Sequence, residues 1–113
     1  MIYTNTTPDA DLLARLRAMP KVEIHVHLEG ATDAETVWHM AERNGVNLPA
    51  ASLEEWKSFY TFRDFTHFID VYQTAGACMR TPEDFAFMTE RFLAIQAAQN
   101  ILYTEAFLSA SLL

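Results

Sequence analysis

The sequence contains very little cysteine and no segment that would direct it to a membrane. Its 113 residues include one cysteine, Cys78, three glycines and four prolines. A single cysteine excludes a disulfide framework and a thiolate metal cage, and it favours a reducing compartment. The N-terminal residues show no basic region followed by an apolar one, so no signal peptide is evident. No apolar run approaches the ~20 residues that span a bilayer. We therefore expect a cytoplasmic protein with no membrane partner.

Basic residues are also scarce. There are 8 Lys and Arg against 15 Asp and Glu, which gives a formal net charge of -7. Nucleic-acid binding needs clustered cations that neutralise phosphates, so we expect no nucleic acid partner. The chain also has no Gly-rich phosphate loop, no G-x-S-x-G, no H-E-x-x-H and no H-x-E with a later P-C-x-x-C. The chemistries that depend on those motifs therefore find little support in the sequence.

The residues that are present predict an α/β fold. Half of the chain is apolar, with eight Phe, four Tyr and two Trp, as in globular domains. Strict alternation predicts a strand at about 22–29, and a second strand is expected at about 101–109. Helices are predicted at about 9–19, 32–44, around Trp56, 65–79 and 81–99. Their start signals are capping boxes at 32–35 and 52–55, a cap at Asp64, and Thr81 followed by Pro82.

Strands separated by helices pair in parallel. Two strands do not form a sheet with two buried faces, and a closed (β/α)8 barrel takes about 250 residues. We therefore expect residues 1–113 to be the N-terminal segment of one larger, incomplete domain.

The segment KVEIHVHLEG, residues 21–30, carries the most distinctive chemistry. On a regular strand Glu23, His25, His27 and Glu29 share one face, opposite an apolar face that we expect to be covered. Imidazoles at i and i+2 can converge on one metal ion. The alternative is an exposed antiparallel strand with two surface histidines. Because strand ends in barrels carry functional residues, we favour a metal pair; Glu23 is left with a structural role.

Three stretches resemble the adenosine deaminase family of the amidohydrolase superfamily. MPKVEIHVHLEGATDAETVWHMAERNGVNLPA, residues 19–50, is similar to the family's opening P-K-x-E-L-H-x-H-L-[DE]-G, its helix and its link ending in L-P-A. FTHFIDVYQTAGACMRTPEDF, residues 65–85, is similar to the family's FL-x-x-[FY] helix and the T-x-E-D helix start that follows it. LYTEAFLSAS, residues 102–111, stands where the second barrel strand lies.

The resemblance implies the N-terminal part of a (β/α)8 TIM barrel with one catalytic Zn2+. By resemblance, His25 and His27 are zinc ligands, and Glu29 and Gly30 lie beside the substrate. An apolar wall is expected from Phe68, Ile69 and Tyr72. The family's other metal ligands and its catalytic Glu lie beyond the second strand, so no catalytic residue is expected in this chain.

The implied reaction is hydrolytic deamination of a 6-aminopurine, with water and a purine nucleoside or base as partners. Two departures bear on the substrate. Glu29 stands where adenosine deaminases more often have Asp, and residues 107–110 stand where many members have Arg-aromatic-Ser-Pro. Adenine and aminodeoxyfutalosine deaminases therefore stay open as alternatives to adenosine, as do a two-metal amidohydrolase and a non-catalytic fragment or binding module.

Overall fold

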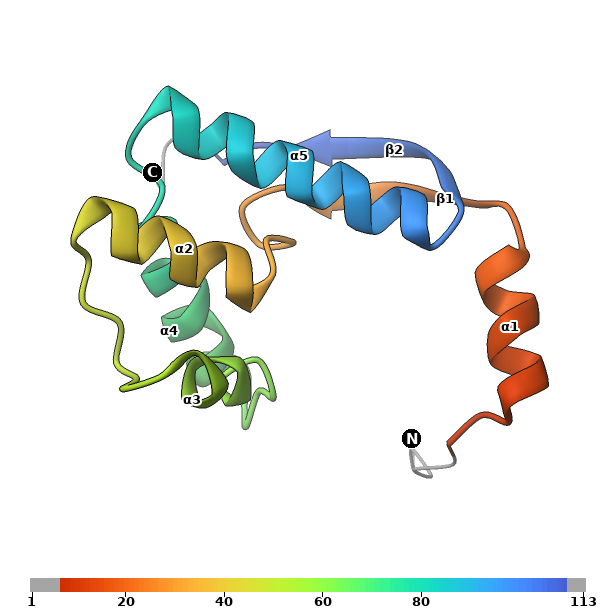
Figure 1. Ribbon diagram of the computed structural model, residues 1–113, viewed down its shortest axis with the longest axis horizontal. Coiled ribbons are helices and arrows are strands. Elements are labelled where there is room, and N and C mark those ends of the chain that lie inside the picture. The colour runs from red at the N-terminus through yellow and green to blue at the C-terminus, as the bar shows by residue number, and fades with distance from the viewer. Residues whose placement is uncertain (1–6, 110–113) are drawn as a thin grey trace.

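The computed structural model describes residues 7–109. Within that range five helices and two strands follow one another in this order: α1 (Ala10–Ala18), β1 (Lys21–His27), α2 (Ala34–Asn44), α3 (Leu53–Ser58), α4 (Phe65–Gly76), α5 (Pro82–Ala98) and β2 (Ile101–Phe107). The strands pair in parallel, as predicted. α5 runs alongside the sheet, α2, α3 and α4 gather at one end of it, and α1 stands apart at the other (Figure 1).

Both strands end two residues earlier than predicted. After β1 the chain turns at once, and Ala31 N–H donates to the carbonyl of His27 at 2.9 Å. The carbonyl of Phe107, the last residue of β2, accepts from Leu28 N–H at 2.8 Å. Glu29 and Gly30 therefore lie in a turn beyond the strand, at its carboxyl end.

The register of the sheet breaks the alternation that the sequence suggests. Glu23 pairs with Thr104 and Val26 with Ala106, so three steps along β1 match two along β2. One extra residue in a strand is a β-bulge, which changes the direction of the side chains on either side of it. Glu23 accordingly accepts a hydrogen bond from Gln96 Nε2 of α5 at 2.6 Å. The prediction that Glu23 shares a face with His25 and His27 is wrong, because Glu23 is directed to α5 whereas the two imidazoles pack against the ring of Phe107.

Helix starts follow the predicted caps with one shift. The side chains of Asp64 and Thr81 cap α4 and α5, and Thr81 and Asp84 complete a reciprocal capping box. α2 starts one residue later than its capping box predicts, because Asp33 is its N-cap. The hydroxyl of Thr32 is used elsewhere and donates to the carbonyl of Leu28 at 3.0 Å.

The hydrophobic core lies between the helices. Trp56, Met40, Met88 and Val37 are completely buried there. The apolar residues Val22 and Ile24 of β1 lie outside this core, and each is 66% exposed. The cover that we expected over the apolar face of this strand is therefore absent from the described residues. None of the helices in residues 7–109 has both the length and the apolar character needed to cross a membrane.

Candidate active site

Six of the seven residues predicted for the site line one open cavity of about 460 Å³. They are His25, His27, Gly30, Phe68, Ile69 and Tyr72. The cavity lies between the carboxyl end of the sheet and α4, two elements that are far apart in the sequence. Its volume falls within the range of small-molecule sites, about 300–1,000 Å³. The carboxyl edge of the strands is also where barrel enzymes place their functional groups.

The two histidines lie side by side on the sheet. Their ring centroids are 5.3 Å apart, at an interplanar angle of 67°. The ring of Phe107, at the end of β2, lies 4.7 Å from that of His25 and 5.9 Å from that of His27. This aromatic contact restricts both imidazoles on one side, so the pair is held in place by the neighbouring strand.

Glu29, the seventh predicted residue, lies behind the cavity. Its side chain is 2% exposed. Oε1 accepts hydrogen bonds from the Tyr72 hydroxyl at 2.6 Å and from Ser109 N–H at 3.2 Å. Burial raises the pKa of Glu29, but the hydrogen bonds from Tyr72 and Ser109 outweigh it and leave the pKa below its ordinary value. The carboxylate is therefore ionised at neutral pH, and Oε2 is buried with no partner among the described residues.

Gly30 allows Tyr72 to reach that carboxylate. A Cβ on Gly30 would lie 3.3 Å from Cε2 of Tyr72 and 3.5 Å from the carbonyl oxygen of His27. Tyr72 was expected to contribute only an apolar wall. Its ring does line the cavity beside Phe68 and Ile69, while its hydroxyl is directed to Glu29.

Ser109 is a site residue that the sequence alone did not identify. It lines the cavity, and its Oγ lies 3.3 Å from Nδ1 of His27. Phe107 was not identified either. Both residues stand at the carboxyl end of β2, next to the carboxyl end of β1. The parallel pairing of the two strands is the signal that could have revealed them.

We next ask which of the described residues could hold a metal ion. No group of three His, Cys, Asp or Glu side chains that could hold a metal ion occurs within residues 7–109. His39 lies on the exposed face of α2, and the ring of His67 accepts a hydrogen bond from Arg63 N–H at 3.2 Å. Among the histidines of residues 7–109, only His25 and His27 lie next to each other in an open cavity. Two neighbouring imidazoles fit a zinc ion that receives its remaining ligands from elsewhere.

Comparison with known proteins defines the class of the chain. Residues 20–113 match the family model described as adenosine deaminase, so the chain belongs to the adenosine deaminase family. The expectation of an α/β segment of a (β/α)8 barrel is confirmed.

Individual relatives are named adenine deaminase. The chain is 42% identical to the adenine deaminase of Rhodospirillum rubrum over 83% of its own length and 28% of that protein. It is 38% identical to the one from Ralstonia nicotianae, over 85% of this chain and 28% of the relative. It is also similar to the crystal structure of adenine deaminase from Arthrobacter aurescens, with a TM-score of 0.73, 36% identity, and coverage of 80% of this chain and 28% of that one. The chain thus spans a little over a quarter of the length of these proteins.

Proposed function

We propose that this chain is the N-terminal part of a zinc-dependent hydrolase that removes the 6-amino group of adenine. Water adds its oxygen to C6, the bond from C6 to the exocyclic nitrogen breaks, and the products are hypoxanthine and ammonia. The observation that carries the proposal is the placement of His25 and His27 in the same cavity as the wall formed by Phe68, Ile69 and Tyr72. The domain is completed by residues that this chain does not contain, and the proposed setting is the cytoplasm.

The residues of this chain would bind and orient rather than transfer protons. His25 and His27 would supply two nitrogen ligands to a bound zinc. The chemistry that a bound zinc offers is a water with its pKa lowered to about 7, and hence a hydroxide at neutral pH. The aromatic and aliphatic side chains of α4 would give an apolar surface against which a purine ring can pack. The general acid is expected beyond residue 113.

Two considerations favour adenine over adenosine. The relatives described above are named adenine deaminases. In addition, the Glu29 carboxylate is almost completely buried, and its Oε1 is already engaged by Tyr72 and Ser109. Its Oε2 has no partner in residues 7–109 but is buried as well, so neither oxygen is exposed to the hydroxyl groups of a ribose. Aminodeoxyfutalosine has no comparable support.

The proposal is tested with the full-length protein that contains this chain, incubated with adenine, adenosine, aminodeoxyfutalosine and cytosine. We expect about one zinc per protein and a preference for adenine, measured by ammonia release. His25→Ala should reduce activity by several orders of magnitude, because it removes a metal ligand. His39→Ala is the matched control and should have wild-type activity, because His39 is exposed on α2 near Glu35 and Glu42. A His25→Ala variant with full activity would contradict the proposal.

A further inference from the structure

Ser109 lies between two residues of the candidate site. Its backbone N–H donates to Oε1 of Glu29 at 3.2 Å, and its Oγ lies 3.3 Å from Nδ1 of His27. Nδ1 of His27 and Oε1 of Glu29 are themselves 4.0 Å apart. That separation is too long for a direct hydrogen bond. Ser109 is therefore the residue that connects the imidazole to the buried carboxylate, through its Oγ on one side and its N–H on the other.

The chemistry of the three groups sets the direction of the hydrogen bonds. An ionised carboxylate only accepts hydrogen bonds, whereas a hydroxyl donates one and accepts others. Oε1 of Glu29 accepts from Ser109 N–H and lies 4.0 Å from Nδ1 of His27, so the neighbouring carboxylate favours a proton on Nδ1. In that arrangement Oγ of Ser109 accepts from His27. Nδ1 of His27 then carries the proton, and the lone pair lies on Nε2.

We propose that Ser109 is a positioning residue, which orients the His27 imidazole and fixes its Nδ1–H tautomer so that Nε2 is available to the metal ion. Histidines that bind metals almost always donate their second ring N–H to a carboxylate, a carbonyl or a water. Here a serine hydroxyl takes that place, and the N–H of the same serine binds the carboxylate of Glu29. The identity of the ion rests on the proposed function, but the orientation and the tautomer of His27 do not.

Thr104 provides a control on the same strand. Its hydroxyl donates to Oε1 of Gln96 at 2.8 Å, on the side of the sheet that faces α5. Thr104→Val removes a hydroxyl and a hydrogen bond from β2 without touching His27. The control therefore distinguishes a general weakening of the sheet from the specific loss of the contact between Ser109 and Nδ1 of His27.

The first measurement follows the tautomer in the metal-free, full-length protein labelled with 15N-histidine. Long-range proton–nitrogen spectra are recorded at alkaline pH, so that the imidazoles are neutral, and the His27 signals are assigned from a His27→Gln variant. We expect the Nδ1–H tautomer in the wild type and in Thr104→Val, and a shift toward Nε2–H in Ser109→Ala. Ser109→Thr, which keeps the hydroxyl, should restore Nδ1–H. An unchanged tautomer in Ser109→Ala overturns the proposal.

The second measurement is zinc affinity, determined by competition with a chromophoric chelator. Ser109→Ala should bind zinc about 10–100-fold more weakly than the wild type, and Ser109→Thr and Thr104→Val should stay close to it. If the wild type binds zinc and deaminates adenine while Ser109→Ala keeps both affinity and tautomer, the role of Ser109 is wrong and the proposed function stands. If the wild type neither binds zinc nor deaminates a purine, but Ser109→Ala changes the tautomer, the function is wrong and the positioning role stands.

Discussion

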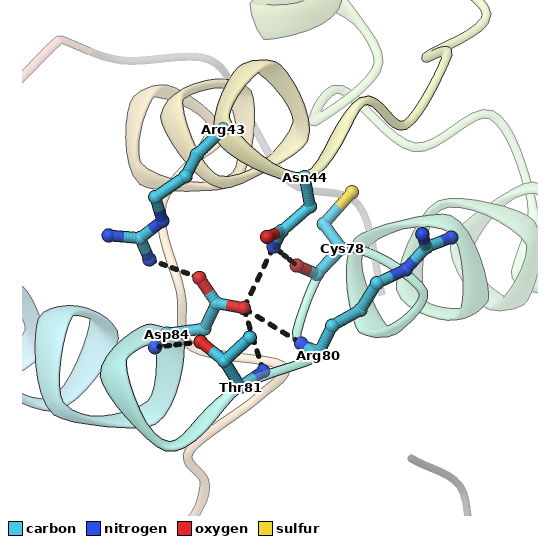
Figure 2. Close-up of polar contacts among 6 residues, drawn as sticks. All are labelled: Arg43, Asn44, Cys78, Arg80, Thr81 and Asp84. Carbon is cyan, nitrogen blue, oxygen red and sulfur yellow. Dashed lines mark hydrogen bonds and ion pairs between the residues drawn. The ribbon is translucent and has the colours of Figure 1, made fainter.

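The carboxylate of Asp84, in the first turn of α5, forms an ion pair with Arg43 at the end of α2 (Figure 2). Oδ2 of Asp84 also accepts from Asn44 Nδ2 at 2.8 Å and from the backbone N–H groups of Arg80 and Thr81, each at 2.9 Å. Asp84 is completely buried. One carboxylate thus joins the end of α2, the link after α4 and the start of α5, which together carry most of the helical core.

Replacement of Asp84 should destabilise the protein strongly. Asp84→Asn keeps the size of the side chain but removes the charge that four donors share. We expect the free energy of unfolding to fall by about 2–4 kcal/mol, because buried donors lose a charged acceptor. Glu83→Gln removes the same charge from the exposed neighbour and should cost less than about 1 kcal/mol. Urea unfolding at neutral pH measures both, and equal losses in the two variants would contradict this role.

The contribution of Asp84 should depend on pH in a defined direction. Burial raises the pKa of Asp84, but hydrogen bonds from the Arg80 backbone, Arg43 and Asn44 hold it well below the ordinary value. A lowered carboxyl pKa stabilises the folded state above the unfolded pKa of about 3.9, and this stabilisation is lost as the pH falls toward the folded pKa. The stability difference between wild type and Asp84→Asn should be constant from about pH 7 to 5 and shrink below about pH 4. Unfolding curves across this range test it; a difference that persists unchanged to about pH 2.5 would refute it.

Removal of the hydroxyl group should lower the stability of the protein at Tyr72 but not at Tyr60. Tyr72→Phe takes a donor from the buried carboxylate of Glu29 and should cost about 1–3 kcal/mol. The hydroxyl of Tyr60 is buried with no partner in residues 7–109, and this burial raises the pKa of Tyr60 well above its ordinary value. Tyr60→Phe should therefore be neutral or stabilising. Thermal unfolding of both variants measures these changes, and a greater loss of stability in Tyr60→Phe than in Tyr72→Phe would argue against these assignments.

Two glycines should separate effects on activity from effects on stability. In Gly30→Ala the new methyl meets the ring of Tyr72 at 3.3 Å, so the ring must move by a few tenths of an ångström. We expect up to about a tenfold loss of adenine deamination, because small misplacements in a site are costly. Gly45 has φ 64° and open space where a Cβ would lie, so Gly45→Ala should cost about 1 kcal/mol of stability and no activity. A larger loss of kcat/KM in Gly45→Ala than in Gly30→Ala would contradict the expectation that Gly30 matters for activity.

The 113-residue chain on its own should associate in solution and have no deaminase activity. Val22 and Ile24 of β1 are each 66% exposed and Leu102 of β2 is 71% exposed, and the sheet has only two strands in the described residues. Exposed strand edges and apolar patches favour association. Light scattering after size exclusion should show oligomers that are absent for the full-length protein. A soluble, active monomer of this length would contradict the expectation.

Local signals in the sequence predicted the elements but not every contact between them. Caps such as Asp64 and Thr81 act within one helical turn, so the residues themselves reveal where α4 and α5 begin. The bulge in β1 depends on how the strand pairs with β2, and the alternating pattern of residues 22–29 gives no sign of it. Gln96, which donates a hydrogen bond to Glu23, and Ser109, which contacts His27, lie 73 and 82 positions from their partners. Such contacts follow from the assembled sheet.

The distance along the chain between the two strands has a consequence for folding. Lys21 pairs with Ile101 and His27 with Phe107, so each pair of partners is 80 positions apart. The helices between them bury their core through contacts that close shorter loops, and long loops are slower to close. We therefore expect α2 to α5 to gain protection from hydrogen exchange before β1 and β2 do. On this order of events, the pocket that holds both histidines is assembled last, so its formation reports the completion of the fold.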